Sequence, residues 1–397
     1  MTSLKTLHDV DVKGKRVLVR VDFNVPLDDK GKITDTTRLE AAVPTIKHLI
    51  DGGARVILKS HLGRPDPENP DSKLKMDEVA KGFAKILGKS VKKLDSCVGP
   101  EVKKAVEAMK DGEVVMLENT RFYHEEKKND LKFAKELAGL GDLFVNDAFG
   151  TAHRAHASTH GVAQHVPSHA GFLLEKEIEA LTPLLEDLEG PLVLVVGGAK
   201  IDTKIGILKN FIEKADIFLV GGGLANTFLY ASGFDVGESL YEKDKKDLAQ
   251  EIMLEADKHE ERFQLPQDVV VASEISDNAQ TIDIPIQDVE LDMKILDIGY
   301  RTIDAYVDAI LKAEVVVWNG PMGLYEKKPF ARGTREIAAA IAKTKATTIL
   351  GGGDTIDAIK KFGHDFIDFD HVSTGGGAML EFLEGKVLPG IEAVMEG

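Results

Sequence analysis

The chain of 397 residues is long enough for two or three domains with substantial cores. Its composition, 43% hydrophobic and 29% charged, is ordinary for a globular protein, and no apolar run approaches the roughly 20 residues that span a bilayer. A net charge of -16 disfavours non-specific nucleic-acid binding. The single cysteine, Cys97, excludes an internal disulfide and is expected to be a buried filler. The charged start shows no signal-peptide pattern, so a cytoplasmic location is expected.

The charge is divided unevenly along the chain. Residues 1–170 hold 28 Lys and Arg against 25 Asp and Glu, together with nine of the 12 histidines. The remaining residues hold 22 Lys and Arg against 41 Asp and Glu. This division favours two units with different partners, although random drift between domains would produce the same pattern.

Short β-branched runs alternate with stretches of helical periodicity. Continuous apolar runs are typical of strands buried on both faces, and their alternation with helices predicts parallel sheets with right-handed crossovers. The number of runs suits two sheets better than one. The predicted strands are Arg16–Val21, Arg55–Lys59, Val114–Leu117, Leu143–Asn146, Leu192–Val196, Ile217–Val220, Val269–Ala272, Val315–Trp318 and Thr347–Leu350.

Helical patterns fill the intervals, for example over Lys132–Leu140 and Thr334–Lys343. The segment Glu175–Leu188 is also helical in character and carries no cluster of site-like residues. We therefore predict an α/β protein of two doubly wound parallel-sheet (Rossmann-like) domains joined by a helix, with a cleft between them. The expected bounds are 1–172 for the first domain, 173–190 for the interdomain helix and 191–387 for the second domain.

Unusual polar residues follow the predicted strands of the first half. Ligands of open α/β sheets bind beyond the carboxyl ends of the strands, and arginine forks pair with phosphate or carboxylate. One arginine alone would be read as a surface charge, but several from different strands predict a site for a small, highly charged anion. The residues concerned are Arg64, Arg121, Arg154, His61, His153 and His156.

Glycine-rich segments follow the strands of the second half. Glycine lets a backbone approach phosphates closely, and N–H groups at a helix N-terminus favour anions. One triplet would be weak evidence because tight turns also need glycine, but several runs together predict phosphate binding. Lys200 and Lys204 would share a helix face if a helix starts there, and Asp354 suits a magnesium ligand. The runs are Gly197–Lys200, Gly221–Gly223, Asn319–Pro321, Gly351–Thr355 and Ser373–Gly377.

Several common nucleotide-binding signatures are absent from the sequence. The missing G-x-x-x-x-G-K-S/T excludes a P-loop enzyme, and the missing G-x-G-x-x-G after the first strand weakens a dinucleotide interpretation. The His-Arg-Asp and Asp-Phe-Gly motifs of protein kinases are absent as well. The residues alone thus indicate a two-domain α/β phosphotransferase with nucleotide on its C-terminal side.

The motifs together resemble the phosphoglycerate kinase family. The resemblance runs from about residue 10 to the C-terminus, with the motifs in the family's order. In the first half the matching segments are RVDFNVP (Arg20–Pro26), SHLGRP (Ser60–Pro65), ENTRF (Glu118–Phe122) and NDAFGTAHRAH (Asn146–His156). In the second half they are GGAK (Gly197–Lys200), WNGP (Trp318–Pro321), FARGT (Phe330–Thr334), GGGDT (Gly351–Thr355) and STGGGA (Ser373–Ala378).

The resemblance implies reversible phosphoryl transfer between ATP and 3-phosphoglycerate, which gives ADP and 1,3-bisphosphoglycerate in glycolysis. It implies that the first domain binds phosphoglycerate and that residues 388–397 return to this domain. Arg38, early in a predicted helix, is added by the resemblance alone. The residues implied for substrate binding are Asp22, Asn24, Arg38, His61, Gly63, Arg64, Arg121 and Arg154.

The resemblance also implies a monomer whose second domain binds ATP or ADP with Mg²⁺. Glu326 would accept hydrogen bonds from the ribose, Leu296 would pack against the base, and Asp354 would be the magnesium ligand. The implied nucleotide-binding residues are Gly198, Lys200, Lys204, Gly222, Leu296, Asn319, Glu326, Gly352, Gly353, Asp354 and Thr355.

Two segments depart from the family pattern. Thr203 stands where the family often has Asp before the second lysine. In the adenine-side segment Lys294–Tyr300, Ile295 replaces a glycine and Tyr300 replaces a proline. Because of these replacements, the resemblance does not determine which side chains line the adenine pocket.

The expected mechanism needs positioning and charge stabilisation more than covalent chemistry by the protein. The attacking carboxylate is ionised at neutral pH, so no general base is required, and His61 and His153 are expected to be supporting residues. Arg38 and Lys200 would hold the charge of the transferring phosphoryl group, with backbone N–H groups near Gly353 and Gly376 adding fixed dipoles. Closure about the interdomain helix would exclude water.

Two other classes of protein are alternatives. A non-catalytic two-domain anion-binding protein would explain two α/β lobes and arginines, but not the glycine runs, paired lysines and acidic position. A nucleotide-dependent oxidoreductase is disfavoured by the missing glycine fingerprint. Phosphoglycerate-dependent formation of ADP with Mg²⁺ would distinguish the kinase from both.

Overall fold

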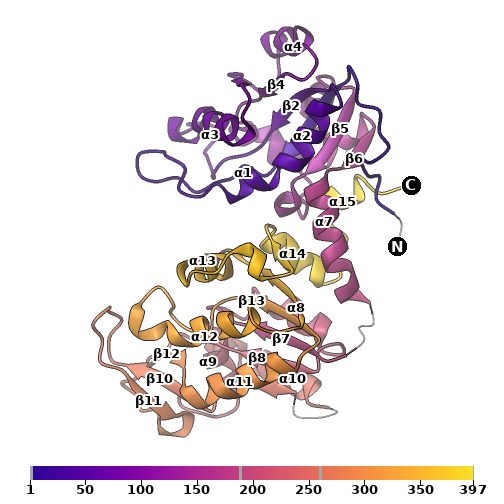
Figure 1. Ribbon diagram of the computed structural model, residues 1–397. Coiled ribbons are helices and arrows are strands. Elements are labelled where there is room, and N and C mark those ends of the chain that lie inside the picture. The colour runs from indigo at the N-terminus through magenta and orange to yellow at the C-terminus, as the bar shows by residue number, and fades with distance from the viewer. Residues whose placement is uncertain (1–2, 187–189, 259–261, 397) are drawn as a thin grey trace. The chain divides into compact units, whose positions relative to one another are not determined.

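The computed structural model describes residues 3–186, 190–258 and 262–396. The chain divides into two compact units, the first Met1–Glu179 with Val387–Gly397 and the second Ala180–Lys386. Figure 1 shows the course of the chain through each unit. Among the described residues, every helix is too short or too polar to cross a membrane.

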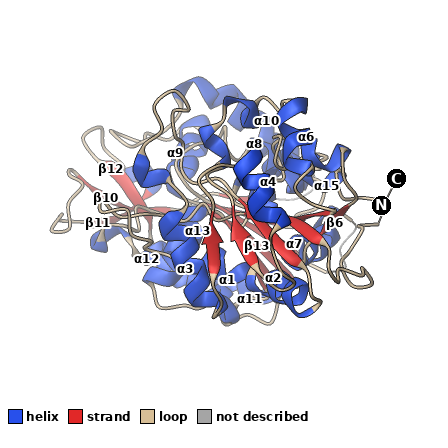
Figure 2. Cartoon of the chain, turned by 90° about the horizontal axis from the view of Figure 1, so that it is seen from above, coloured by secondary structure: helices blue, strands red, loops and turns tan. Residues whose placement is uncertain are grey.

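The first unit is built on a six-stranded parallel sheet with the order β3-β4-β2-β1-β5-β6. Helices lie on both sides of the strands, as in a doubly wound fold (Figure 2). The strands are β1 Arg16–Val21, β2 Arg55–Lys59, β3 Val91–Lys93, β4 Val114–Met116, β5 Leu143–Asp147 and β6 Ser168–Ala170. The α-helices are α1 Thr37–Ala41, α2 Val43–Asp51, α3 Asp77–Leu87, α4 Pro100–Glu107, α5 His124–Lys127, α6 Leu131–Ala138, α7 Phe172–Leu181 and α15 Pro389–Glu392.

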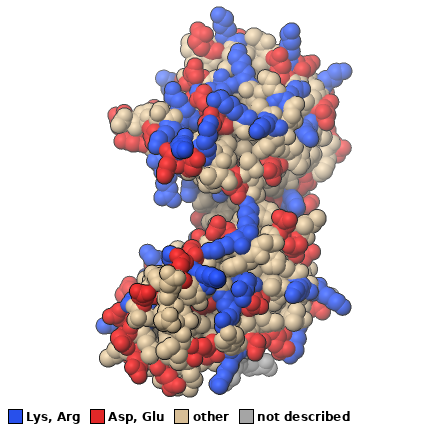
Figure 3. Space-filling view, turned by 60° about the vertical axis from the view of Figure 1, so that its left-hand side comes forward, with Lys and Arg blue, Asp and Glu red and all other residues tan. Residues whose placement is uncertain are grey.

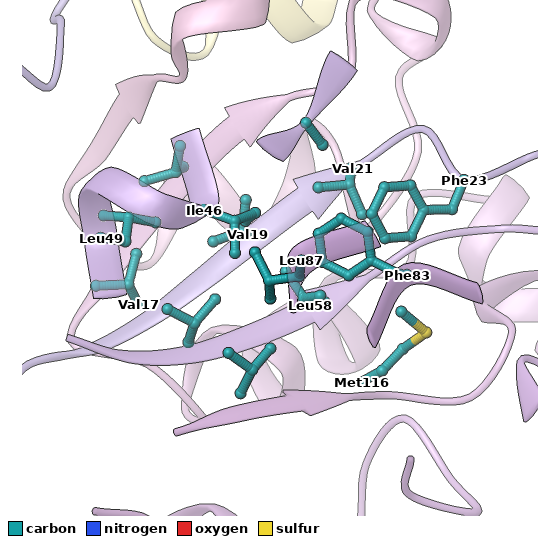
Figure 4. Close-up of a cluster of buried hydrophobic side chains, with 14 of the residues drawn as sticks. Val17, Val19, Val21, Phe23, Ile46, Leu49, Leu58, Phe83, Leu87 and Met116 are labelled. Atoms are coloured by element: carbon teal, nitrogen blue, oxygen red, sulfur yellow. The ribbon is translucent and has the colours of Figure 1, made fainter. Parts of the chain in front are cut away.

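Both faces of this sheet are buried, which explains the continuous apolar strands. Side chains of a strand point alternately to its two faces. On β1, Val19 faces a core that contains Ile46 of α2 and Phe83 of α3 (Figure 4). Leu18, on the opposite face, belongs to a second core with Phe133 of α6. The sheet is therefore held from both sides, and its strand ends are fixed in place.

The second unit contains a six-stranded parallel sheet, β15-β14-β13-β7-β8-β9, and a three-stranded antiparallel sheet, β11-β10-β12. The strands are β7 Leu192–Val196, β8 Ile217–Val220, β9 Phe263–Gln264, β10 Asp268–Ala272, β11 Ile282–Pro285, β12 Lys294–Ile298, β13 Val315–Asn319, β14 Thr347–Gly351 and β15 His371–Ser373. The α-helices are α8 Ile205–Phe211, α9 Gly222–Ala231, α10 Lys246–Ala256, α11 Tyr300–Lys312, α12 Arg332–Ile341, α13 Gly353–Lys361 and α14 Gly377–Leu383.

Each predicted strand is present within one residue of its predicted bounds, but β10 does not join a parallel sheet. It pairs antiparallel with β11 and β12. A parallel pair needs a long crossover, whereas only residues 273–281 separate β10 from β11. The short or half-exposed strands β3, β6, β9, β11, β12 and β15 are not predicted because they lack a continuous apolar run.

The predicted interdomain helix is shorter than expected. Helix α7 ends at Leu181 and a 3₁₀ turn follows at Thr182–Leu185. Pro183 explains this change because proline has no N–H and disfavours the α conformation of the residue before it. Residues 187–189 of the predicted segment lie outside the described residues, and the boundary between the units follows Glu179, inside α7.

The C-terminal segment packs on the first unit. The side-chain amide of Asn146 donates to the carbonyl of Gly390 at 2.8 Å, and the Gly390 N–H donates to the carbonyl of Ala152 at 2.8 Å. Leu4 and Met395 form a β-bridge. The described part of the expected returning segment, 388–396, thus lies against the end of β5 and the start of the chain.

Helix α7 begins at a buried carboxylate. Asp147, the last residue of β5, is fully buried, and its Oδ1 accepts hydrogen bonds from the N–H groups of Leu173 (2.9 Å) and Leu174 (3.4 Å). Burial raises the pKa of Asp147 to about 7, although these hydrogen bonds oppose the rise. The carboxyl group therefore titrates near neutral pH in the folded chain.

Replacing Asp147 with asparagine should flatten the pH dependence of stability. A carboxyl group whose pKa rises on folding stabilises the fold below its ordinary pKa of 3.8 and loses that contribution as the pH rises through about 7. Between about pH 5 and 8 the wild-type chain should lose about 2 kcal/mol of unfolding free energy from this group. Asp147→Asn keeps the Oδ1 acceptor and should lack this loss. Urea unfolding of both chains at the two pH values measures this loss of unfolding free energy. An equal loss in the wild type and in Asp147→Asn would contradict the assignment.

Candidate active site

Two loops of the first unit are joined beyond the carboxyl ends of β1 and β2. Asp22 and Asn24 follow β1, and His61 and Gly63 follow β2. The Asn24 side-chain oxygen accepts from the N–H of Gly63 at 2.8 Å. Neighbouring parallel strands end at the same edge of a sheet, so these residues, which are distant in sequence, share one site.

Arg38 reaches this edge from α1. Its Nη1 donates to the Asn24 carbonyl at 2.8 Å and lies 3.3 Å from Oδ2 of Asp22. The Arg38 side chain is 34% exposed, whereas that of Asp22 is 9% exposed. A guanidinium carries five N–H donors, so Arg38 is anchored by Asp22 and still has donors for a ligand.

Arg121 comes from a 3₁₀ turn, Thr120–Phe122, that follows β4. Its Nη1 donates to the Gly63 carbonyl at 2.6 Å, and its backbone N–H donates to the side chain of Asn119 at 3.1 Å. Burial, followed by the charges of Arg154 and Arg20, lowers the pKa of Arg121 to about 10. The neighbouring arginines therefore lie close enough to repel its charge.

Arg64 and Arg154 differ in their surroundings. Arg64 follows Gly63, is exposed, and makes no hydrogen bond or ion pair with any residue that the structure describes. Arg154 donates from Nε to Nε2 of His153 at 3.0 Å. The structure thus brings Asp22, Asn24, Arg38, His61, Gly63 and Arg121 into contact, with Arg154 acting on them electrostatically and Arg64 at the exposed rim.

His153 and His156, two further histidines of this region, are uncharged at neutral pH. Burial lowers the pKa of His153 and of His156 to about 4 each. Nearby arginines lower both values further, while Asp22 and Glu126 respectively oppose the shift. Neither ring can supply a proton near neutral pH, which fits a supporting role.

Two buried basic residues behind this edge are not identified from the sequence. Arg20 on β1 is 1% exposed and Lys59 on β2 is 0% exposed. The Lys59 amine lies 4.3 Å from the ring centroid of Phe144 and has no hydrogen-bond partner in the described part of the chain. Burial lowers the pKa of Lys59 well below its usual value. The sequence signal that could identify both residues is a charged side chain at the carboxyl end of an otherwise apolar strand.

A cavity of about 490 Å³ lies in the second unit, beyond the carboxyl ends of β7, β8 and β13 and along β12. Its lining is mainly apolar, as is usual for small-molecule sites. The expected nucleotide residues in its wall are Gly198, Gly222, Leu296, Glu326 and Asp354. The other expected residues, Lys200, Lys204, Asn319, Gly352, Gly353 and Thr355, stand in the same loops as these or beside them.

Glycine allows the loops around the cavity to pack backbone against backbone. Gly222 has φ +65°, and a β-carbon there would lie 2.7 Å from the Gly198 carbonyl oxygen. Gly320 has φ +100°, and a β-carbon there would lie 2.3 Å from the Gly197 carbonyl oxygen. Only glycine fits both the conformation and the contact.

Asn319, at the end of β13, connects three of these loops. Its side-chain oxygen accepts from the Lys204 amine, and its side-chain N–H donates to the Gly351 carbonyl at 2.7 Å. The hydroxyl of Thr355 accepts from the Gly320 N–H at 2.8 Å. Burial lowers the pKa of Lys204 to about 8, opposed by Asp354. A negative ligand would raise this pKa and so stabilise the positive charge of the lysine.

Lys200 and Lys204 do not share a helix face. Helix α8 begins at Ile205, so both lysines precede it; Lys200 is exposed, while Lys204 is buried. The hydroxyl of Thr203 donates to the Lys200 carbonyl at 3.0 Å. Thr203, which departs from the family pattern, thus lies in a local turn between the two lysines.

The two departures on the adenine side have different outcomes. Ile295 is buried and lines the cavity, so its side chain occupies space that a glycine would leave free. Tyr300 is 54% exposed, with the Arg332 guanidinium 4.0 Å from its ring centroid, and it is not among the described residues that line the cavity. At the cavity wall, Lys294 pairs with Glu238 at 2.6 Å.

Asp354 is the expected metal ligand. It is exposed in the first turn of α13, directly after Gly353, and no group of three or more His, Cys, Asp or Glu residues suited to a metal occurs in the described ranges. A single carboxylate fits Mg²⁺ that takes its other ligands from a nucleotide and water.

Gly376, the other glycine expected near the phosphates, has φ +48° and directly precedes α14.

Both signs of charge occur on the visible face of each unit (Figure 3). The net charge of about +3 in the first 170 residues therefore does not make that unit uniformly basic. The concentration of positive charge that matters is local, at the carboxyl ends of β1, β2 and β4.

Comparison with known proteins identifies the family. The family model of phosphoglycerate kinase matches residues 7–386. Phosphoglycerate kinases of Dictyoglomus turgidum and Pelotomaculum thermopropionicum are 54% and 52% identical to the chain, over 98% and 99% of both sequences respectively. The solved phosphoglycerate kinase of Coxiella burnetii has a TM-score of 0.88 at 42% identity and covers 99% of both chains; that of Pyrococcus horikoshii OT3 has 0.86 at 36% identity and covers 98% of both. The chain therefore belongs to the phosphoglycerate kinase family.

Proposed function

We propose that the chain performs its family's reaction, reversible transfer of a phosphoryl group between ATP and 3-phosphoglycerate, with one ligand bound by each unit. The first unit would hold phosphoglycerate and the second the magnesium complex of the nucleotide. The observation that carries this division is the arginine cluster of the first unit, where Asp22 anchors Arg38 and the exposed Arg64 has no partner among the described residues. The glycine-lined, mainly apolar cavity of the second unit supports the nucleotide assignment.

In the first unit, the anionic groups of phosphoglycerate would replace the solvent around the arginines. Arg64, Arg121 and Arg154 can pair with its phosphate, because guanidinium forks match phosphate oxygens. Asp22 can accept a hydrogen bond from the substrate hydroxyl, and Asn24 and Gly63 hold the two loops in register. The buried Asp22 anchor keeps Arg38 directed toward the reacting end.

In the second unit, Lys200 and Lys204 would contact the nucleotide phosphates, with backbone N–H groups near Gly353 and Gly376 adding fixed dipoles. Leu296 and Ile295 offer apolar surface to the base, and the exposed Glu326 carboxylate can accept from ribose hydroxyls. Asp354 would hold Mg²⁺, which when bound neutralises phosphate charge.

The chemical step follows from these positions. A carboxylate oxygen of phosphoglycerate attacks the terminal phosphorus in line; the new P–O bond forms as the bond to ADP breaks, and no proton is transferred. Arg38 and Lys200 would stabilise the charge on the transferring group. Because separate units bind the two ligands, we propose that the units close to bring them together and exclude water.

The same proposal includes a cytoplasmic monomer that acts on small molecules. Its single cysteine is buried and suits a reducing compartment. The net charge of -16 does not favour nucleic acid as a partner.

Arg38→Ala should reduce turnover by roughly 10²–10³-fold, because one preorganised contact to transition-state charge is lost. Binding of MgATP should stay within a few-fold of wild type, since Arg38 belongs to the first unit. Steady-state rates and calorimetric titration with MgATP measure the two effects. Arg335→Ala, which removes an exposed arginine that pairs with Glu336, is the matched control. Turnover of Arg38→Ala within a few-fold of the control would contradict the role of Arg38.

Asp354→Asn should raise the Mg²⁺ concentration for half-maximal activity by roughly tenfold or more, because magnesium prefers a carboxylate oxygen to an amide oxygen. The measurement is a Mg²⁺ titration of the rate at constant total nucleotide. Asp304→Asn, an exposed carboxylate of α11, controls for the change of charge. An unchanged Mg²⁺ dependence would rule out Asp354 as the ligand.

A further inference from the structure

Arg20 and His61 form a contact inside the first unit. Arg20 lies on β1 and is 1% exposed, and His61 lies just after β2 and is 4% exposed. Nη2 of Arg20 lies 3.0 Å from Nδ1 of His61. Nε and Nη1 of Arg20 have no hydrogen-bond partner within the described part of the chain. The guanidinium is therefore directed to the ring by the one hydrogen bond that it makes within the described residues.

This contact determines where the His61 proton is. A guanidinium is always protonated and has no acceptor, so Nδ1 of His61 must accept the hydrogen bond and carry no proton. A neutral imidazole with an unprotonated Nδ1 has its proton on Nε2. Oδ1 of Asp22 lies 4.0 Å from Nδ1, too far to accept a hydrogen bond from it.

The surroundings also prevent a second proton on the ring. Burial, followed by the charges of the surrounding arginines, lowers the pKa of His61 well below its usual value. The nearby carboxylate of Asp22 already interacts with Arg38 at 3.3 Å. The charged groups facing the ring are Arg20 from β1, Asp22 from the loop after β1, Arg38 from α1, Arg121 from the turn after β4 and Arg154 from the segment after β5.

We propose that Arg20 is a positioning residue for the substrate: it fixes His61 as a neutral imidazole whose Nε2–H donates to phosphoglycerate. This inference rests on the proposed function, in which His61 belongs to the phosphoglycerate site. Among the described residues, the groups that approach the His61 ring nitrogens, Arg20 and Asp22, both face Nδ1. The Nε2–H group is therefore the donor left for a ligand. The donor has a fixed direction and keeps it across neutral pH.

His153 provides an internal comparison. Nε of Arg154 donates to Nε2 of His153 at 3.0 Å, so here Nε2 is the acceptor and the proton is on Nδ1. The same rule therefore assigns opposite tautomers to the two histidines. A single spectrum of the whole chain can test both assignments.

Nuclear magnetic resonance of the ligand-free chain with ¹⁵N-labelled histidine tests the tautomer. His61→Gln identifies the His61 signals by their loss, and His153→Gln those of His153. We expect His61 to show an unprotonated Nδ1 and a protonated Nε2, His153 to show the reverse, and neither ring to titrate between about pH 5.5 and 8. A proton on Nδ1 of His61, or titration at its ordinary pKa, would overturn the proposal.

Substitution of Arg20 tests the link to substrate. In Arg20→Met the pKa of His61 should rise and both tautomers should become populated, and the KM for phosphoglycerate should increase roughly tenfold, the loss typical of one hydrogen bond to a charged group. The KM for MgATP should stay within about twofold. Arg20→Lys retains a cationic donor and should recover part of both losses. It also serves if Arg20→Met does not fold, as judged by circular dichroism.

The outcomes separate this proposal from the proposed function. If wild-type His61 has the expected tautomer but the KM for phosphoglycerate is unchanged in both Arg20 variants, the pair is only structural and the proposal is wrong. If the wild-type chain does not bind phosphoglycerate at all, the proposed function is wrong, whatever the tautomer. A selective rise in the KM for phosphoglycerate, partly reversed in Arg20→Lys, supports the positioning role.

Discussion

Repulsion among arginines at one sheet edge is the constraint on which the first unit depends. Arg20, Arg38, Arg121 and Arg154 all lower the pKa of His61, so their fields overlap at that ring. Backbone carbonyls and the Asp22 carboxylate anchor Arg38 and Arg121, whereas Arg20 and Arg154 donate to histidine nitrogens. Like charges held at short range by a rigid scaffold favour an anion that can accept from several of them at once. The doubly buried sheet supplies that scaffold, because hydrophobic cores pack on both of its faces.

The second unit offers a negative ligand backbone N–H groups in place of an arginine cluster. Glycines bring the loops after β7, β8 and β13 into backbone contact, and Asn319 connects the buried Lys204 to the end of β14. Backbone N–H groups cannot titrate and do not repel one another as arginines do, so they suit a long, multiply charged ligand that also carries a metal. The mainly apolar cavity beside these loops suits the base of the same ligand. The two units therefore have complementary chemistry on similar folds.

Much of this arrangement could be predicted from the sequence, because continuous apolar runs mark doubly buried strands and their polar ends mark the site. Pairing could not be read from the same runs: the pattern of Val269–Ala272 is equally compatible with the antiparallel sheet in which it lies. Arg38 looks ordinary in sequence, since only the fold shows that α1 directs it to Asp22. The role of Arg20 cannot be read from the sequence, because a cation inside a strand has no local pattern that reveals a buried histidine as its partner.

We propose that each unit binds one ligand through its own charged residues. A calorimetric cross-titration tests it most directly, using Arg64→Ala and Lys200→Ala, two variants that each remove one exposed cation and leave the buried contacts intact. Each full-length variant would be titrated separately with 3-phosphoglycerate and with MgATP. We expect Arg64→Ala to lose affinity for phosphoglycerate alone and Lys200→Ala to lose affinity for MgATP alone. Equal loss of both ligands in either variant, or the reverse pattern, would contradict it.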